Sequence, residues 1–203
     1  MSSPATVFIV DDDEEVRSAL QLLMESVGLP SETYSSAQQF LEQFEPNRSG
    51  CIIVDVRMPG MSGLDLQAQL ASEKFHPPII IITGHGDVPM AVRAVQAGAV
   101  DFIEKPFNNQ AMLDSVHRAI EKDAQQRGEV SRLLDIEAHY NGLTPREKEV
   151  FQYVVEGKRN KVIAIDMGVS QSTVEAHRAK VMEKMAAATL SDLMRMALLL
   201  GLL

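Results

Sequence analysis

The sequence predicts an α/β domain with a doubly wound parallel sheet, followed by a smaller all-helical domain. Short apolar runs alternate with helical patterns over the first 120 residues, and no strand-like run follows residue 142. The runs are short, rich in β-branched residues and not alternating, which is typical of strands buried on both faces of a parallel sheet. They are Val7–Val10, Cys51–Val54, Ile79–Ile82 and Val100–Ile103, with a weaker run near Glu32–Tyr34.

Helical patterns connect these runs. The apolar positions from Val16 to Val27 are spaced by four, three and four residues, which places them on one stripe of a helix. Ser62 is placed to cap a second helix that begins at Gly63. Because strands that alternate with helices imply right-handed crossovers, we expect five strands and five helices in residues 1–122.

The second half of the chain is predicted to be helical throughout. Thr144–Glu147 has the pattern of a capping box, with Thr at the N-cap, Pro at the first helical position and Glu at the third. Three more helical segments are expected near residues 160–167, 171–185 and 190–200.

A polar, helix-compatible stretch lies between the two halves. We interpret residues 123–141 as a helical linker that extends the last helix of the first domain, with Gly128 as its weak point. Leu133, Leu134 and Ile136 are candidates for coiled-coil contacts. The predicted domains are therefore 1–122 and 142–203, joined by this linker.

The charge is unevenly distributed between the two halves. The 203 residues carry 28 acidic and 19 basic side chains, a net charge of −9. Residues 1–142 hold 21 of the acidic and 10 of the basic side chains (net −11), whereas residues 143–203 hold 7 and 9 (net +2). A net charge of −9 argues against nucleic acid as a partner of the whole chain, but the second half alone is not excluded.

Several classes of protein are excluded by composition. The single cysteine, Cys51, cannot form an internal disulfide, which excludes a disulfide-stapled scaffold. The longest apolar runs, such as Ile79–Ile82 and Met196–Leu200, are far shorter than the ~18 residues of a membrane helix. Met1–Pro4 lacks the basic start and apolar core of a signal peptide. We therefore expect a cytoplasmic protein with no membrane partner.

Polar side chains follow the predicted strands at the points where these end. Asp11–Asp13 follows the first strand, Asp55 the third, Thr83 the fourth, and Lys105 the fifth. The carboxyl ends of parallel strands meet at one edge of the sheet, where ligands bind. Each residue alone is most often a helix cap, a turn residue or a solvated side chain, but the combination at four strand ends is not explained that way.

The chemistry of this edge follows from its charges. Crowded carboxylates repel one another, so a hard cation such as Mg²⁺ is expected among them, and a hydroxyl and an amine suit a phosphoryl group. A carboxylate can act as a nucleophile that forms an aspartyl phosphate, with the cation and Lys105 offsetting charge. Asp55 is the candidate nucleophile because it stands alone at the end of the central strand.

These residues lie in four stretches, which are Val10–Asp12, Val54–Gly63, Ile82–Asp87 and Gly98–Phe107. The stretches resemble the receiver domain of bacterial two-component response regulators, and the last two resemble the FixJ subgroup in particular. The second half resembles a LuxR-type helix-turn-helix domain. Its matching stretches are Leu143–Glu147, Asn160–Lys161, Ser172–Arg178 and Met182–Lys184.

The resemblance implies a flavodoxin-like sheet of order 2-1-3-4-5 and a role for each residue at its edge. Asp55 would accept phosphate from a sensor histidine kinase. Mg²⁺ (or Mn²⁺) would be held by Asp12, Asp55 and the backbone carbonyl of Arg57, with Asp11 holding a metal-bound water. Thr83 and Lys105 would bind phosphoryl oxygens, Phe102 would be the aromatic switch, and the Lys105–Pro106 bond would be cis. Residues 88–97 and 108–122, with Phe102 between them, would form a face for homodimerisation on phosphorylation.

The resemblance also implies promoter DNA as a partner. Asn160–Met167 would be the support helix and Ser172–Met185 the recognition helix, whose N-terminal part enters the major groove. Core positions are expected at Val174, Val181 and Met185. Glu175, Ala176 and Ala179 would lie toward the bases, and the candidates for phosphate or base contacts are Lys161, Thr173, His177, Arg178, Lys180 and Lys184.

The predicted function is that of a phosphorylation-activated transcription regulator, not of an enzyme. Two alternatives remain open from the sequence alone. One is a phosphohydrolase with an aspartyl nucleophile, although such enzymes typically have an acid where Arg57 stands. The other is a phosphorylation-dependent adaptor whose helical half binds protein instead of DNA.

Overall fold

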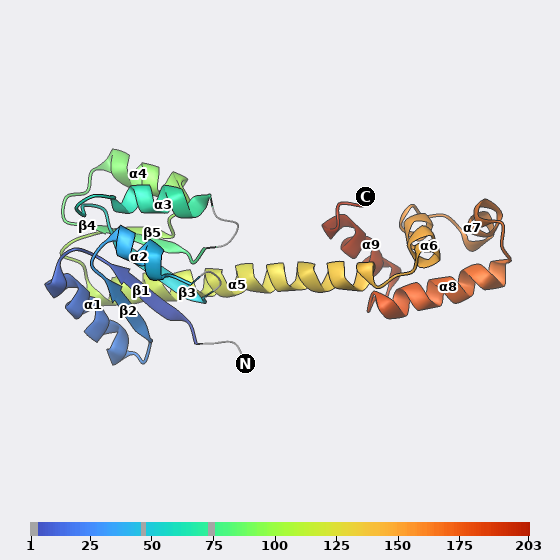
Figure 1. Cartoon of the computed structure of the whole chain (residues 1–203), viewed down its shortest axis with the longest axis horizontal. Coiled ribbons are helices and arrows are strands. Elements are labelled where there is room, and N and C mark those ends of the chain that lie inside the picture. The colour runs from blue at the N-terminus through green and yellow to red at the C-terminus, as the bar shows by residue number, and fades with distance from the viewer. Residues whose placement is uncertain (1–3, 46–47, 73–75) are drawn as a thin grey trace. The chain divides into compact units, whose positions relative to one another are not determined.

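The computed structural model describes residues 4–45, 48–72 and 76–203 (Figure 1). Contacts within the chain divide it into two compact units, Met1–Gln126 and Arg127–Leu203, and each is described separately. Residues 1–3, part of the stretch in which no signal peptide was predicted, lie outside the described residues. No helix in the described part of the chain is long and apolar enough to cross a membrane.

The described residues of the first unit form a five-stranded parallel sheet of order β2-β1-β3-β4-β5, which confirms the predicted fold. The weak strand signal near Glu32 belongs to β2, an edge strand that pairs only with β1. The strands are β1 (Thr6–Val10), β2 (Ser31–Tyr34), β3 (Gly50–Asp55), β4 (Ile79–Thr83) and β5 (Asp101–Glu104).

Helices cover both faces of this sheet (Figure 1). Side chains from α2, α3 and α4 pack on one face, and side chains from α1 and the first part of α5 pack on the other. The helices are α1 (Glu14–Ser26), α2 (Ala37–Gln43), α3 (Gly63–Ala71), α4 (Val88–Gln96) and α5 (Asn109–Asn141).

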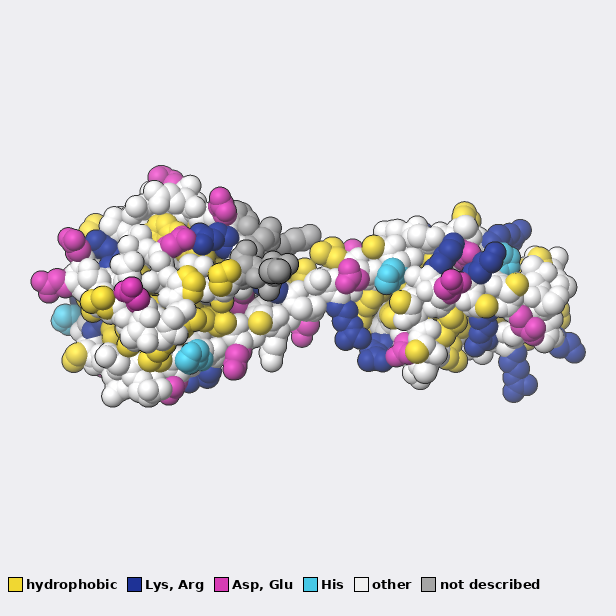
Figure 2. Space-filling model, turned by 90° about the horizontal axis from the view of Figure 1, so that it is seen from below, with side chains coloured by type: hydrophobic (Ala, Val, Ile, Leu, Met, Phe, Trp, Pro, Cys, Tyr) yellow, Lys and Arg dark blue, Asp and Glu magenta, His cyan; other side chains and the backbone are white. Residues whose placement is uncertain are grey.

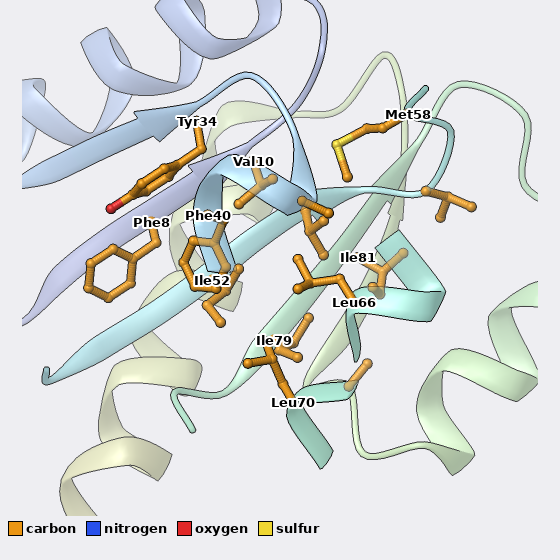
Figure 3. Packing of buried hydrophobic residues seen from close by; sticks show 14 of the residues in the cluster. Phe8, Val10, Tyr34, Phe40, Ile52, Met58, Leu66, Leu70, Ile79 and Ile81 are labelled. Atoms are coloured by element: carbon orange, nitrogen blue, oxygen red, sulfur yellow. The ribbon is translucent and has the colours of Figure 1, made fainter. Parts of the chain in front are cut away.

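Alternate residues of each central strand point to opposite faces of the sheet. In β1, Phe8 packs with the α2, α3 and α4 side (Figure 3), whereas Val7 and Ile9 pack with α1 and α5. Every residue of β1 except Thr6, and of β4 except Ile79, is fully buried. A shift of one residue in pairing would exchange the two buried faces, so the packing fixes where each strand ends.

The start of β3 is tied to α5. The buried carboxylate of Asp123 accepts hydrogen bonds from the Gly50 N–H (3.0 Å) and the Ser49 hydroxyl (2.9 Å).

Burial, with a smaller contribution from the charge of Asp123, raises the pKa of the Cys51 thiol to about 12. The thiol is therefore neutral and acts as an apolar packing group.

The second unit is helical, as predicted, and has its own core. Val174, Val181 and Met185 are fully buried in it, which confirms their predicted role. Phe151 is a large buried side chain at its centre. The helices are α6 (Pro145–Val155), α7 (Asn160–Met167), α8 (Gln171–Lys184) and α9 (Leu190–Leu199), together with the last part of α5.

The linker residues are helical, as predicted, and α5 continues through Gly128, because the cost of one glycine, about 1 kcal/mol relative to alanine, is small beside the helix-favouring residues around it. One of the three coiled-coil candidates was wrong. Ile136 is not an exposed coiled-coil position but is 4% exposed and packs in the core of the second unit. Leu134, in contrast, is 59% exposed.

The capping box of α6 is formed and is linked to α8. Thr144 accepts the Glu147 N–H, and Glu147 Oε2 accepts the Thr144 N–H at 2.8 Å. Lys184 Nζ donates to the same Glu147 oxygen at 2.6 Å. The hydrogen bond from Lys184, with that from the Thr144 N–H, lowers the pKa of Glu147 from its ordinary value of 4.5 to about 2.

We predict that the stabilisation provided by Glu147 depends on pH. Because its folded-state pKa is lowered, the stabilisation is complete above pH 4.5 and is lost as the pH falls from about 4.5 toward 2. Glu147→Gln keeps the capping geometry but removes the charge. Hydrogen exchange of the α6 amides, corrected for intrinsic rates, should be slower in the wild type than in the variant at pH 6. This difference should shrink by pH 3, and a difference that stays constant would contradict the role of the ion pair.

Candidate functional site

The parallel register brings the predicted site residues to one edge of the sheet. Asp55 ends β3, opposite Ile82 of β4, and Thr83 ends β4, opposite Glu104 of β5. Asp11 follows β1, and Lys105 follows β5. The Lys105 N–H donates to the Thr83 carbonyl at 2.7 Å, which extends the β4–β5 pairing by one step into the site.

Lys105 joins the two buried carboxylates. Its Nζ donates to Asp11 Oδ2 and to Asp55 Oδ1, each at 2.7 Å. The Asp11 side chain is fully buried, that of Asp55 is 6% exposed and that of Lys105 is 19% exposed. The ammonium is thus shared between acids that are 44 positions apart in the chain, and it offsets their mutual repulsion.

The remaining carboxylate oxygens are held by backbone amides. The Asp13 N–H donates to Asp11 Oδ1 at 2.9 Å, and the Arg57 N–H donates to Asp55 Oδ2 at 2.5 Å. The carbonyl of Asp11 accepts a hydrogen bond from Arg17 Nη1 at 2.6 Å. The orientation of both acids is therefore set by the turns that follow their strands.

Burial and hydrogen bonding shift the pKa values of Asp11 and Lys105 in opposite directions. Burial raises the pKa of Asp11 above its ordinary value, although the hydrogen bonds from Lys105 and the Asp13 N–H act in the other direction. Burial lowers the pKa of Lys105, but its bonds to Asp11 and Asp55 together outweigh this and leave it raised. Lys105 is therefore a cation at neutral pH.

The turns after β1 and β3 each depend on one residue type, an N-capping acid at Asp13 and a glycine at Gly63. Asp13 is the N-cap of α1, where its side chain accepts the Glu15 and Val16 amides, so it is a structural acid of the turn. Gly63 begins α3 directly against the backbone of Asp55, and a Cβ there would lie 2.2 Å from the Asp55 carbonyl oxygen. A side chain at position 63 would displace the end of β3.

The donors at this edge fit a hard divalent cation. Carboxylate and carbonyl oxygens are the ligands that Mg²⁺ prefers, and it commonly takes only one or two carboxylates from the protein. Asp11 and Asp55 provide such oxygens at one place, where both contact Lys105, and Asp12 is the exposed neighbour of Asp11. The Arg57 backbone adjoins them through its N–H, which donates to Asp55 Oδ2. Within residues 4–45, 48–72 and 76–203, no three carboxylate, imidazole or thiolate side chains are gathered as a preformed metal cluster.

Thr83 and Phe102 both lie close to Gly86, in the segment between β4 and α4. Thr83 is fully buried, and its Oγ1 accepts the His85 N–H at 3.3 Å. A Cβ on Gly86 would lie 2.9 Å from Phe102 Cε1 and 3.2 Å from Thr83 Cγ2. The half-buried Phe102 ring and the Thr83 methyl group therefore both border the backbone of Gly86. The Lys105–Pro106 peptide bond is cis, as expected.

The second unit contains the predicted pair of support and recognition helices. Gly168 ends α7 in the left-handed conformation (φ 66°), which lets the chain turn sharply into α8. Ser170 caps α8 by accepting the Thr173 N–H at 3.1 Å. Figure 2 shows Lys and Arg side chains standing out from the surface of this unit.

The candidate DNA contacts fall into exposed and partly held groups. On α8, Glu175, Ala176, Ala179 and Lys180 are exposed, and so is Lys161 on α7. Thr173, His177 and Arg178 are half-buried. Side-chain contacts within the unit engage Thr173 (with Ser170), Arg178 (with Asn160, 2.9 Å) and Lys184 (with Glu147).

Two side-chain hydrogen bonds of the structure could not be predicted from the sequence: the one from Arg17 to the Asp11 carbonyl and the one from Arg178 to Asn160. Arg17 resembles a solvated residue in the first turns of a helix, and Asn160 has no pattern that pairs it with Arg178, which is 18 positions later. Glu175, which was expected to lie toward the bases, has a partner within its own helix. Its Oε1 accepts Gln171 Nε2 at 3.0 Å, one helical turn earlier.

Comparison with known protein families gives two matches that together cover most of the chain. Residues 7–117 match the response regulator receiver domain. Residues 141–197 match the bacterial regulatory proteins of the luxR family. The two matches correspond to the α/β sheet with its edge site and to the helical unit with its recognition helix.

Full-length relatives have the same combination of domains. The chain is 44% identical to nodulation protein W of Bradyrhizobium diazoefficiens over 201 residues, which is 99% of this chain and 88% of that protein. It is 46% identical to the transcriptional regulatory protein FixJ of Rhizobium meliloti over 193 residues, or 95% of each chain. It is 44% identical to the response regulator protein TodT of Pseudomonas putida, covering 96% of this chain and 86% of that one.

Two solved response regulator structures also align with nearly the whole of this chain. The response regulator StyR, determined at low resolution, is 41% identical, with a TM-score of 0.86 over 96% of this chain and 98% of that one. Full-length FixJ from B. japonicum is 38% identical over the whole of both chains, with a TM-score of 0.59.

We predict that Lys105→Met destabilises the first unit by about 2–3 kcal/mol. Removing one partner from a buried ion pair typically costs ~3–5 kcal/mol, and the partial exposure of Lys105 reduces this. Adding Asp11→Asn should recover part of the loss, because one of the two buried carboxylates that lost the ammonium is then neutral. Urea unfolding of the full chain can be followed by pulsed thiol labelling of the single, buried Cys51. A Lys105→Met variant as stable as the wild type would contradict this role of the ammonium.

Proposed function

The chain belongs to the two-component response regulators that combine a receiver domain with a LuxR-type DNA-binding domain, and we propose that Asp55 is its phosphoacceptor. It is a transcription regulator, not an enzyme, so the phosphohydrolase and adaptor alternatives are set aside. The observation that carries the proposal is the pair of 2.7 Å contacts that place Lys105 between Asp11 and Asp55.

The proposed reaction transfers a phosphoryl group from a phosphohistidine of a sensor kinase. A carboxylate oxygen of Asp55 forms a bond to phosphorus while the bond from phosphorus to the imidazole nitrogen breaks, and the imidazole leaves with that electron pair. The Arg57 N–H holds Oδ2 of Asp55, which orients the carboxylate. Lys105 is close enough to Asp55 to exchange its ion pair for a contact with a phosphoryl oxygen.

Mg²⁺, or Mn²⁺, is the proposed cofactor of this edge. Asp11, Asp12, Asp55 and the carbonyl of Arg57 would hold it, and it would offset charge on the phosphoryl oxygens. Its fit is supported by the oxygen donors and by the excess of carboxylates over cationic groups. Two carboxylates share the single ammonium of Lys105, and Asp12 stands beside them.

Signal output is proposed to pass through Thr83 and Phe102. Thr83 would bind a phosphoryl oxygen, and its movement would change the space available to the Phe102 ring, because both side chains border Gly86. Phosphorylation can shift this equilibrium only if the two conformations bind the phosphoryl group differently. The surface of α4, β5 and α5 around Phe102 is then proposed to pair with a second copy of the chain.

The second unit is proposed to bind promoter DNA through α8. The exposed stretch that includes Glu175, Ala176 and Ala179 would face the bases, and Lys161 and Lys180 would contact phosphates. Thr173, His177 and Arg178 remain proposed contacts, although Arg178 is also held by Asn160. The functional boundaries proposed are 1–122, a helical linker 123–141, and 142–203, in a cytoplasmic protein.

We predict that Asp55→Asn abolishes phosphorylation by a small acyl phosphate in the presence of Mg²⁺. The amide is not a nucleophile toward phosphorus, so phosphate incorporation measured by intact mass should fall to background. Asp13→Asn is the matched control, because it makes the same change in an acid that caps α1, and it should retain uptake. Uptake at the wild-type level by Asp55→Asn would refute the site.

We further predict that Lys180→Ala weakens DNA binding and makes it less dependent on salt. Each neutralised phosphate contributes about −0.9 to the slope of log affinity against log salt concentration, so the slope should become shallower by about 0.9. Lys122→Ala removes the same charge from an exposed position in the first unit and serves as the control, with all variants measured without phosphorylation so that the proposed pairing face is not engaged. Fluorescence anisotropy of the full chain on a promoter fragment measures both slopes. Equal slopes for Lys180→Ala and the control would exclude Lys180 as a phosphate contact.

A further inference from the structure

Arg17 connects α1 to the main chain of the acidic turn. It lies in the first turns of α1 and is half-buried, and its Nη1 donates to the carbonyl oxygen of Asp11 at 2.6 Å. The carbonyl belongs to the first residue after β1, at the point where the chain leaves the sheet. A cationic side chain therefore bonds to the backbone, and not to a carboxylate, in a turn that contains three consecutive acids.

This contact completes the bonding of Asp11. Its N–H donates to the Tyr34 carbonyl (3.1 Å), its Oδ1 accepts the Asp13 N–H (2.9 Å) and its Oδ2 accepts Lys105 Nζ (2.7 Å). The N–H bond continues the pairing with β2, and the two carboxylate bonds lie within the site. Arg17 adds the restraint on the carbonyl, and so fixes the direction of the peptide that leads to Asp12.

We propose that Arg17 is a positioning residue for phosphoryl transfer, which fixes the Asp11 main chain so that the Asp11 and Asp12 carboxylates are oriented for a divalent cation. The proposal rests on the proposed function of this edge. Arg17 donates to the peptide between the two acids, so its loss would free that peptide to rotate. Partners that orient metal ligands typically contribute 10- to 100-fold to metal affinity.

Because Arg17 is charged, the direction in which Mg²⁺ affinity changes when Arg17 is removed distinguishes its possible roles. A guanidinium near the site repels a second cation, so a purely electrostatic role predicts that removing Arg17 strengthens Mg²⁺ binding. A positioning role predicts weaker binding. A role only in the stability of α1 predicts a lower unfolding temperature with Mg²⁺ affinity unchanged.

The test measures Mg²⁺ binding to the full chain without any phosphoryl donor. Backbone amide shifts of Asp12 and Asp13 are titrated with MgCl₂ in the wild type, Arg17→Gln, Arg17→Lys and Arg93→Gln. Arg93→Gln is the matched control, because it removes the same charge from an exposed position on α4. We expect the Kd for Mg²⁺ to rise about 10-fold in Arg17→Gln and about 3-fold in Arg17→Lys, which keeps the charge but not the fork of donors.

The results distinguish the proposed role of Arg17 from the proposed role of Asp55 as phosphoacceptor, so either one can fail alone. Unchanged or tighter Mg²⁺ binding in Arg17→Gln overturns the positioning role, whatever the result for Asp55→Asn. If Arg17→Gln does not fold, Arg17→Lys decides in the same way: weaker binding supports the role, and wild-type binding overturns it. Because no phosphoryl group is present, a failure of the Asp55 assignment leaves this measurement interpretable.

Discussion

The site depends on one electrostatic constraint, the burial of two carboxylates that repel each other. Asp11 and Asp55 have almost no exposure to solvent, and Lys105 contacts both at 2.7 Å. Buried charge is costly unless it is paired and hydrogen-bonded, so the fold must bring the ammonium to this point and place backbone amides on the other oxygens. The strand order and the turns after β1, β3 and β5 meet this requirement. A phosphoryl group bound here would enter an arrangement that already separates and orients its charges.

Few atoms separate this pair of carboxylates from the surface near β5. The buried Thr83 is joined by its backbone to Lys105, and its methyl group and the Phe102 ring both lie close to Gly86. A change in what Lys105 contacts is therefore connected through few atoms to a side chain that is partly exposed on β5. The second unit has its own core and a net charge of opposite sign to that of the acidic half. The overall charge of −9 thus averages an acidic part, which contains the carboxylates of the site, with a mildly basic part, which contains α8.

Much of the fold could be predicted because its signals are local. The run of four isoleucines in β4 identifies a buried strand, and the Thr144 and Ser62 caps mark helix starts with side-chain chemistry that the structure reproduces. The contacts that make the site are not local. Lys105 and Asp11 are 94 positions apart, and they could be placed near each other only through the predicted sheet, in which the carboxyl ends of parallel strands meet at one edge.

The errors and omissions have physical causes as well. Ile136 was assigned to a linker because the surrounding residues are polar, but one apolar face of a helix is enough to join a core. The burial of Asp11 beside the exposed Asp12 depends on how the chain leaves β1, which no spacing of acids reveals. Arg17 was overlooked for a related reason, since a bond from a side chain to a backbone carbonyl leaves no pattern in residue types.

We propose that the phosphoryl group is bound at Asp55, which is held between Lys105 and the Arg57 amide. This can be tested by phosphorylating the full chain with an acyl phosphate and Mg²⁺, reducing it with borohydride, and locating the product by peptide mass spectrometry. Borohydride converts an acyl phosphate to an alcohol, so we expect a single modified position, Asp55, in the peptide that contains β3. Modification at Asp11 or Asp12, or phosphate retained on a histidine with Asp55 unmodified, would contradict it.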